Sequence, residues 1–267
     1  MIPSCLYLGI DFIKARVIYF PEILDNEYLD FKYELSSKTG ELSNHRKAEF
    51  KDLEFIYYNS GFLRIQGSLH KYYNDGLHNY DDFTVTKLLW VLNDLEKRFD
   101  LKLTDLKLEN LEFGVNITDV TSFDYENLML QRGKRFDRIC SGTVFKVEHS
   151  EQIIKVYNKG VTEKLGHFLV RYEVKIKKSR KLNKLNVYTL DDLKQRDVYP
   201  LLESYLLQEW ANVLYVDEEL DVRTVKFWKS LKGMKKKRTI EKFNANNLVF
   251  NSMAMAIESK CKELRKC

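Results

Sequence analysis

The sequence predicts an α+β fold in which helices pack on one face of a central antiparallel or mixed sheet. Three observations predict it. Alternation of polar and apolar residues, typical of strands, recurs in four segments. Amphipathic helical patterns lie between and after these segments. The polar side of the alternating segments is rich in charge, so the sheet is expected to leave an open, polar and basic face.

The strand prediction depends on side-chain alternation. Successive side chains of a strand point to opposite faces, so each alternating segment has one apolar and one polar face. Further strands are expected at Leu6–Tyr19 and Phe55–Tyr58. The four alternating segments are Leu63–Lys71, Leu111–Thr118, Ile153–Lys159 and Val170–Lys177.

Helical patterns supply the cover for the sheet. Val85–Phe99 carries an apolar stripe at helical spacing, which predicts an amphipathic helix. Thr189 precedes an acidic turn and is expected to be an N-cap. A helix is expected from Pro200 to about Tyr215. Asn246–Leu264 is expected to form the last helix.

Strand patterns give way to helices near residue 185. Residues 1–185 are therefore expected to form one domain and residues 186–267 a helical, basic extension. The chain has a formal net charge of +5, concentrated in two blocks. Ser150–Lys181 carries nine Lys/Arg against three Asp/Glu, and Arg223–Lys242 carries nine against one. Such blocks suit a phosphate backbone or an anionic membrane surface, and a merely solvated charged face is the alternative.

Several function classes lack their sequence signatures. The four cysteines form no C-x-x-C pair, which argues against a zinc knuckle or a redox motif. No P-loop pattern occurs, and no stretch approaches 18 apolar residues. The N-terminus has no basic region of the signal-peptide type. We expect a cytoplasmic protein with reduced cysteines and no membrane partner.

The segment Lys155-Val-Tyr-Asn-Lys159 is the strongest candidate for a catalytic site. A tyrosine is a poor nucleophile at neutral pH because its unperturbed pKa is about 10. Lys155 and Lys159, on the same strand face as Tyr157, would favour the phenolate and neutralise a phosphate oxygen. Tyr157 is one of 16 tyrosines, so a core or surface role is the alternative.

Candidate metal ligands are His70, His78, Glu112 and Asn116. Mg²⁺ prefers oxygen ligands, whereas Mn²⁺ accepts imidazole readily. One carboxylate with histidines and an amide oxygen makes a site with little negative charge. Such a site would bind a metal well once a DNA phosphate joins it as a further ligand. For each histidine, a hydrogen-bonded surface residue is the alternative.

Four blocks in the same order resemble the replication initiator encoded by gene II of filamentous phages and its plasmid relatives. The resemblance spans about residues 60 to 195. The first block resembles the family's serine-x-x-lysine and glycine-x-histidine-asparagine patterns, and the others resemble its central strand, its tyrosine strand and its arginine-aromatic-glutamate strand. The blocks are Gly67–Lys71 with Gly76–Asn79, Leu111–Ile117, Thr143–Phe145 with Ile154–Lys159, and Leu169–Lys177 leading into Leu182–Leu190.

The resemblance implies a nicking enzyme distantly similar to the HUH endonucleases. Such an enzyme cuts one strand at the origin, stays attached to the 5′ phosphate through a tyrosine, and leaves a 3′ hydroxyl for the host polymerase. Tyr157 takes the nucleophile position, and His78 the histidine of the second pattern. Asn116 stands where the phage protein has an aspartate, so a metal ligand is expected to have moved to Glu112. The chain is short for a full initiator, and a C-terminal portion is expected to be missing.

The resulting prediction is a metal-dependent nickase of single-stranded origin DNA for rolling-circle replication of a phage or plasmid, with host polymerase and helicase as partners. Mg²⁺ or Mn²⁺ is held by Glu112, His78 and His70 or Asn116. Glu173 is expected to ligate the metal or orient a lysine, and Arg171 to hold a phosphate. The expected DNA contacts are Lys71, Arg171, Lys175, Lys177, Lys235, Lys236 and Lys237.

Two alternatives stay open. A non-catalytic DNA-binding or copy-control protein would need only the basic sheet face, and it predicts no covalent adduct. A structural, membrane-associated phage protein would use its basic helices on anionic lipid, and it predicts liposome binding without affinity for DNA.

Overall fold

The computed structural model describes residues 9–118, 123–216, 231–245 and 247–263. The chain divides into two compact units. Unit 1 comprises residues 1–113, 175–201 and 264–267, and unit 2 comprises residues 114–174 and 202–263. Neither unit is a continuous stretch of the sequence. The predicted division of function between residues 1–185 and 186–267 stays a prediction.

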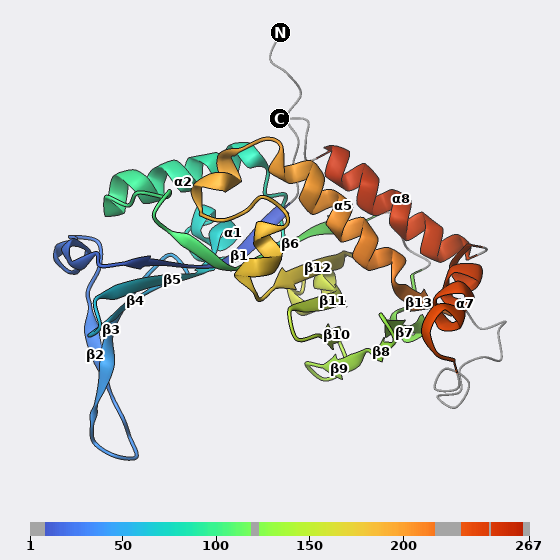
Figure 1. Cartoon of the computed structure of the whole chain (residues 1–267), viewed down its shortest axis with the longest axis horizontal. Helices are drawn as coiled ribbons and strands as arrows, with labels where there is room; N and C mark the ends of the chain where they lie inside the picture. Colours follow the sequence, from blue (N-terminus) through green and yellow to red (C-terminus); the bar gives the residue numbers. More distant parts are fainter. Residues whose placement is uncertain (1–8, 119–122, 217–230, 246, 264–267) are drawn as a thin grey trace, which may run out of the picture. The chain divides into compact units, whose positions relative to one another are not determined.

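Unit 1 contains an antiparallel sheet with the strand order β2-β3-β4-β5-β1, followed by the first part of β6. In Figure 1, β2 and β3 form a long hairpin that extends away from the other strands of this unit. The strands are β1 (Gly9–Ile18), β2 (Lys32–Leu35), β3 (Leu42–Phe50), β4 (Leu53–Tyr58), β5 (Phe62–Ser68) and β6 (Lys107–Ile117). The helices are η1 (Pro21–Asp25), α1 (Leu69–Tyr73), α2 (Val85–Phe99), α4 (Ser179–Asn183) and η3 (Asp191–Lys194).

Helix α2 packs on the sheet of unit 1 and matches its predicted bounds. Thr84 caps it by accepting a hydrogen bond from the backbone N–H of Lys87 at 3.4 Å. The last residue of the helix, Phe99, packs on Phe55 of β4 and Phe50 of β3, with ring centroids 4.7 and 5.5 Å apart. Aromatic packing therefore anchors the C-terminal end of α2 to the sheet.

Unit 2 contains the strand order β12-β11-β10-β9 and a separate three-stranded sheet, β13-β7-β8. Its strands include the last part of β6. The others are β7 (Leu128–Gln131), β8 (Lys134–Arg135), β9 (Asp137–Ile139), β10 (Val144–Glu148), β11 (Gln152–Asn158), β12 (Val170–Ile176) and β13 (Val213–Tyr215). Its helices are η2 (Tyr125–Asn127), α3 (Lys159–Thr162), most of α5 (Val198–Ala211), α7 (Gly233–Ala245) and α8 (Leu248–Glu263).

Trp210 is the centre of the core of unit 2. Its ring stacks on Phe250 of α8 at 5.4 Å and meets Tyr172 of β12 edge-on at 5.3 Å. The indole N–H donates to the backbone oxygen of Phe250 at 3.2 Å. Tyr172 in turn donates to the backbone oxygen of Leu206 at 3.1 Å. These contacts hold α5 and α8 against β12, the strand that carries Arg171 and Glu173.

The α+β class is confirmed, with a large antiparallel sheet and helices that include the C-terminal ones. None of the helices in the described residues is both long and apolar enough to cross a bilayer. The predicted strands Leu111–Thr118, Ile153–Lys159 and Val170–Lys177 are confirmed to within a few residues as β6, β11 and β12.

Two strands end earlier than predicted. The strand expected over Leu63–Lys71 stops at Ser68, and helix α1 begins at Leu69, so His70 and Lys71 are helical. The cause is local: Gly67 has a φ of +147°, and the Ser68 side chain accepts from the backbone N–H of Lys71 as an N-cap. Lys159 likewise begins α3, which Asn158 caps.

Two helix predictions are also corrected. The helix expected to reach Tyr215 ends at Ala211, because the β-branched and aromatic residues that follow form β13 and pair with β7. Thr189 is not an N-cap. Its backbone N–H and its hydroxyl both donate to the carboxylate of Asp192, and the 3-10 helix starts at Asp191.

Gly114 marks the closest approach between β6 and β12 within unit 2. A Cβ at this position would lie 2.2 Å from the backbone oxygen of Tyr172 and 2.7 Å from the Cα of Glu173. The absence of a side chain therefore lets the backbone of β6 lie directly against Glu173.

Gly114→Ala should lower the free energy of unfolding by about 3 kcal/mol, because the added methyl group meets backbone atoms that cannot move independently. Urea unfolding of the full chain, followed by circular dichroism, measures the loss. Gly40→Asn is the control, since no atom lies within 4 Å of its ideal Cβ and its φ of +68° lies in the left-handed region that asparagine adopts. Equal losses in the two variants would contradict the close approach.

Candidate active site

In unit 2, three polar side chains meet at Glu173. Lys155 Nζ donates to Glu173 Oε1 at 2.6 Å, and Arg171 Nε donates to Oε2 at 3.0 Å. The Tyr157 hydroxyl donates to Oε2 at 3.4 Å. Lys155 and Tyr157 lie two residues apart on β11, and Arg171 and Glu173 two residues apart on β12, so each pair shares one face of its strand. The structure therefore brings together the predicted tyrosine, one predicted lysine and the predicted arginine and glutamate.

Glu173 is ionised although it is only 2% exposed. Burial by itself would raise the pKa of this carboxyl, because it removes water from the charged form. The positive charges of Lys155 and Arg171, with their hydrogen bonds, outweigh burial and hold the pKa of Glu173 well below its usual range. At Glu173 the predicted polar face of the sheet is therefore buried. The charges of Glu173, Lys155 and Arg171 compensate one another within the protein.

Arg171 also positions the end of β6. Its guanidinium Nη1 donates to Asn116 Oδ1 at 3.2 Å, and both side chains are buried. Arg171 was predicted to hold a phosphate, and Asn116 to ligate a metal. In the structure Arg171 is 3% exposed and binds Glu173 and Asn116. Its visible role is to fix these two side chains.

In unit 1, Asp11 of β1 is a buried carboxylate that the sequence analysis missed. Ser68 Oγ donates to its Oδ1, and Asn79 Nδ2 donates to its Oδ2 at 2.7 Å. Ser68 and Asn79 come from the two patterns of the first family-like block, which the structure joins through Asp11. A charged residue on the apolar stretch of a strand was the available signal, since such a residue is rarely buried without a partner or a role.

Glu112 of β6 lies close to Asp11. Both side chains are buried, and a carboxylate oxygen of each lies within 4.8 Å of the other. Lys175 Nζ is 3.7 Å from Glu112 Oε2 and 3.6 Å from the centroid of the Phe12 ring. Two adjacent carboxylates supply the hard oxygen ligands that Mg²⁺ and Mn²⁺ bind. Asp11 and Glu112 of unit 1 are thus candidate ligands for a cation, and the ligand role expected of Glu173 stays a prediction.

The predicted metal ligands His70 and His78 share a different partner, Asp81. Nε2 of His70 lies 2.7 Å from Asp81 Oδ1, and Nδ1 of His78 lies 3.4 Å from the same oxygen. Lys87 Nζ donates to Asp81 Oδ2 at 2.7 Å. Burial would raise the pKa of Asp81, but its hydrogen bonds to His70 and Lys87 hold it well below its usual range. These contacts give both histidines a structural partner, and their role as ligands stays a prediction.

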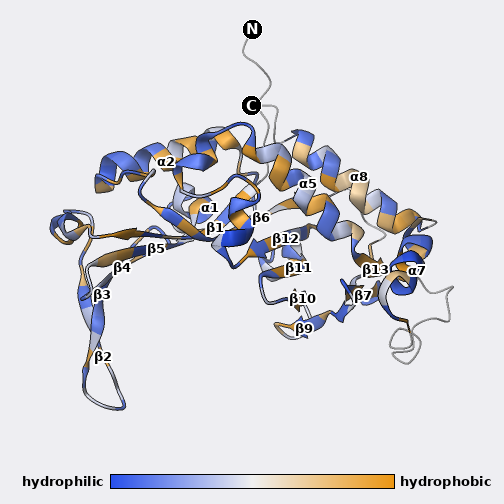
Figure 2. Ribbon diagram, in the orientation of Figure 1, coloured by the Kyte–Doolittle hydropathy of each residue, from blue (hydrophilic) through white to orange (hydrophobic). Residues whose placement is uncertain are grey.

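The remaining predicted lysines lie in varied surroundings. Lys71 Nζ donates to Asp52 at 3.1 Å. Lys159 is 1% exposed at the start of α3, so it does not share the strand face of Tyr157 as predicted. Lys177 follows the end of β12 and is half-buried. Lys235 and Lys237 are exposed on α7, a helix that Figure 2 shows to be largely hydrophilic, whereas Lys236 lies half-buried against Gly133.

Comparisons with known proteins leave the family open. No family model matches the chain, and no curated protein matches it. A solved structure described as "Structure of Rolling Circle Replication Initiator Protein from Geobacillus stearothermophilus" is similar over 89% of this chain and 97% of that chain, with 13% sequence identity and a TM-score of 0.44. Similarity at this level establishes neither a common fold nor a common function, so the function is inferred from the residues themselves.

Glu173→Gln should lower the free energy of unfolding by about 3 kcal/mol at neutral pH, because Arg171 and Lys155 lose a buried counter-charge. The pKa of Glu173 is lowered in the folded chain, so its contribution is fully present above its unfolded pKa of about 4.3 and is lost as the pH falls through the folded value. Urea unfolding of both proteins between about pH 7 and pH 3 should show the difference shrinking at acid pH.

The exposed Glu163 provides the matched control. Glu163→Gln should change the free energy of unfolding by less than about 0.5 kcal/mol. The free energy of unfolding of the wild type could instead exceed that of Glu173→Gln by a constant amount down to about pH 3. That result would show that Glu173 is not the ionised centre of this network.

Proposed function

We propose that the protein nicks single-stranded DNA by attack of Tyr157 on a phosphodiester, as an initiator of rolling-circle replication would. One observation carries the proposal: the Tyr157 hydroxyl donates to an ionised, buried glutamate whose second oxygen is bound by a lysine. A tyrosine that only packs in a core needs no such network. The half-buried position of Tyr157 leaves part of its side chain accessible to a substrate.

In the proposed step, the Tyr157 oxygen forms a bond to phosphorus while the bond from phosphorus to the 3′ oxygen breaks. Glu173 orients the phenol, whose proton is released to solvent, and the leaving 3′ oxygen takes a proton from solvent to become a hydroxyl. The 5′ phosphate stays on the tyrosine as a phosphodiester, so the reverse reaction can rejoin ends without ATP. Lys155, bound to Glu173, lies on the same strand face and can also bind a non-bridging phosphate oxygen.

A divalent cation fits the two adjacent carboxylates of unit 1. We propose that Asp11 and Glu112 hold Mg²⁺ or Mn²⁺. When bound, the cation would polarise the scissile phosphate and offset the charge that develops on it. Ser68 and Asn79 orient Asp11 by hydrogen bonds, which is how ligating carboxylates are commonly supported.

The resemblance to the gene II initiators of filamentous phages supports the same proposal. Ser68 and Asn79, which carry the family-like patterns of the first block, converge on Asp11, while Lys71 binds Asp52. The exposed Lys235 and Lys237 of α7, with Lys175 and Lys177 after Glu173, would contact the DNA backbone. Origin DNA of a phage or plasmid and the host polymerase and helicase would be the partners.

Tyr157→Phe should abolish the covalent adduct with a 3′-labelled single-stranded oligonucleotide that spans the origin, because the attacking oxygen is lost. Affinity for the same oligonucleotide should stay within a few-fold, about 1 kcal/mol or less. Denaturing gel electrophoresis detects the adduct, and fluorescence anisotropy measures binding. Tyr188→Phe, at an exposed tyrosine, is the control and should form the adduct normally. An adduct formed by Tyr157→Phe would show that another residue attacks, and binding by the wild type without any adduct would favour the non-catalytic DNA-binding alternative.

Chelation by EDTA should stop adduct formation, and Mg²⁺ or Mn²⁺ should restore it. Asp11→Asn and Glu112→Gln should each raise the metal concentration needed for half-maximal rate by about tenfold or more, because each removes a charged oxygen ligand. Asp75→Asn is the matched control at an exposed aspartate that pairs with Lys51. Adduct formation that continues unchanged in EDTA would contradict the metal proposal.

A further inference from the structure

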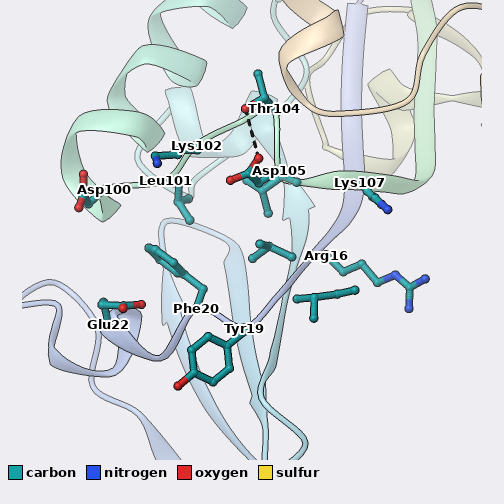
Figure 3. A pocket seen from close by; sticks show the side chains of 13 residues that line it. Arg16, Tyr19, Phe20, Glu22, Asp100, Leu101, Lys102, Thr104, Asp105 and Lys107 are labelled. Carbon is teal, nitrogen blue, oxygen red and sulfur yellow. Dashed lines mark hydrogen bonds between the residues drawn. The ribbon is translucent and has the colours of Figure 1, made fainter.

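Unit 1 contains a cavity of about 590 Å³ that none of the candidate active-site residues line. It lies where the end of β1, the turn after α2 and the start of β6 meet (Figure 3). Its volume falls within the range of sites that bind small molecules or single nucleotides.

Figure 3 shows an ordered arrangement of side chains around this cavity. Arg16 and Lys107 lie on one side, and Asp100 and Glu22 lie on the other. Phe20 and Tyr19 lie between the two sides, with Asp105 opposite them. Lys102 lies near Asp100, so one side carries the cations Arg16 and Lys107, and the opposite side carries two carboxylates and one lysine.

These charges do not neutralise one another. Arg16 pairs with Glu109 at 3.1 Å, outside the lining, and its side chain remains 49% exposed. Within the part of the chain that the structure describes, no ion pair engages Lys107, Asp100 or Glu22. Lys107 is therefore available as a donor on one side, and Asp100 and Glu22 are available as acceptors on the other.

Tyr19 is held in an exposed position by its backbone. It is 74% exposed, has a φ of +59°, and its backbone N–H donates to Gly61 at 2.9 Å. A positive φ is uncommon for a large aromatic residue and costs about 1–3 kcal/mol. The chain thus keeps a large apolar ring in water at the edge of a charged cavity.

We propose that this cavity binds one unstacked nucleotide of a DNA single strand, with a base that carries an exocyclic amine. The base stacks on Tyr19, since every base offers a face to an aromatic ring. Its amine donates to Asp100 or Asp105, because carboxylates accept from such amines. Arg16 and Lys107 bind the adjacent phosphate. The inference deepens the proposed nicking function by adding a second contact for the strand, and it rests on the same DNA substrate.

The test measures affinity of the full chain for fluorescently labelled (dC)20 and (dT)20 by anisotropy, because cytosine has an exocyclic amine and thymine lacks one. Tyr19→Asn should weaken binding of (dC)20 by about fivefold to a hundredfold, the effect of losing one base stack. Asparagine tolerates the positive φ at this position, so the ring is removed without added backbone strain. Tyr188→Asn is the matched control and should bind (dC)20 within twofold of the wild type.

Two further variants test the ends of the cavity. The wild type should prefer (dC)20 to (dT)20 by about fivefold or more, and the double variant Asp100→Asn with Asp105→Asn should show a smaller preference, because an amide oxygen accepts more weakly than a carboxylate. Lys107→Gln should make the slope of log affinity against log salt shallower by about 0.7. Binding of (dC)20 by Tyr19→Asn with wild-type affinity, or equal binding of the two oligonucleotides by the wild type, would overturn the proposal.

The adduct assay separates this inference from the nicking proposal. Loss of (dC)20 affinity in Tyr19→Asn, in a protein that forms no adduct through Tyr157, would support the cavity and contradict nicking. A Tyr157 adduct in a protein whose Tyr19→Asn variant binds normally would support nicking and contradict the cavity.

Discussion

Glu173 is a buried anion, and the strands around it are arranged to compensate its charge. Removing a carboxylate from water costs several kcal/mol, which only close and well-oriented cations offset. Arg171 precedes Glu173 by two residues on the same face of β12, and Lys155 reaches it from β11. Gly114 removes the side chain that would otherwise occupy the space beside Glu173. Strand register, backbone spacing and charge at this point therefore depend on one another.

This network changes the role expected for the lysines. Two lysines on the strand face of Tyr157 were expected to favour the phenolate directly. In the structure Lys155 is bound to Glu173, and Lys159 is buried at the start of a helix. The nearest charged partner of the phenol is thus a carboxylate that accepts its proton in a hydrogen bond. In the proposed reaction the protein would orient the nucleophile through Glu173, and a bound cation would neutralise the phosphate.

The sequence predicted much of the fold because alternation and amphipathic stripes report directly on which side chains are buried. Helix Val85–Phe99 and the strands around Glu112, Tyr157 and Glu173 follow from those patterns. Helix α1 could not be predicted in the same way, because five residues are too few for a helical period and its start depends on the φ of Gly67. The partner of Glu112 was missed since Asp11 lies far away in the sequence, and only strand pairing brings such residues together. His70 and His78 were singled out as ligands, but their nearest carboxylate, Asp81, is a neighbour in the chain that was given no role.

Ser68 shows why a family-like pattern can carry structural information as well as chemistry. Its hydroxyl donates to Asp11 and accepts from the backbone N–H of Lys71, so one side chain ends β5, starts α1 and orients a buried carboxylate. Its own backbone N–H approaches Asp52 at 3.4 Å, and Asp52 also binds Lys71. A serine-x-x-lysine spacing places the serine at the N-cap of a helix and the lysine in its first turn. This holds whatever reaction the protein catalyses. The resemblance in this block therefore bears first on the local fold and on the placement of Asp11, and the case for catalysis depends on the network around Tyr157 and Glu173.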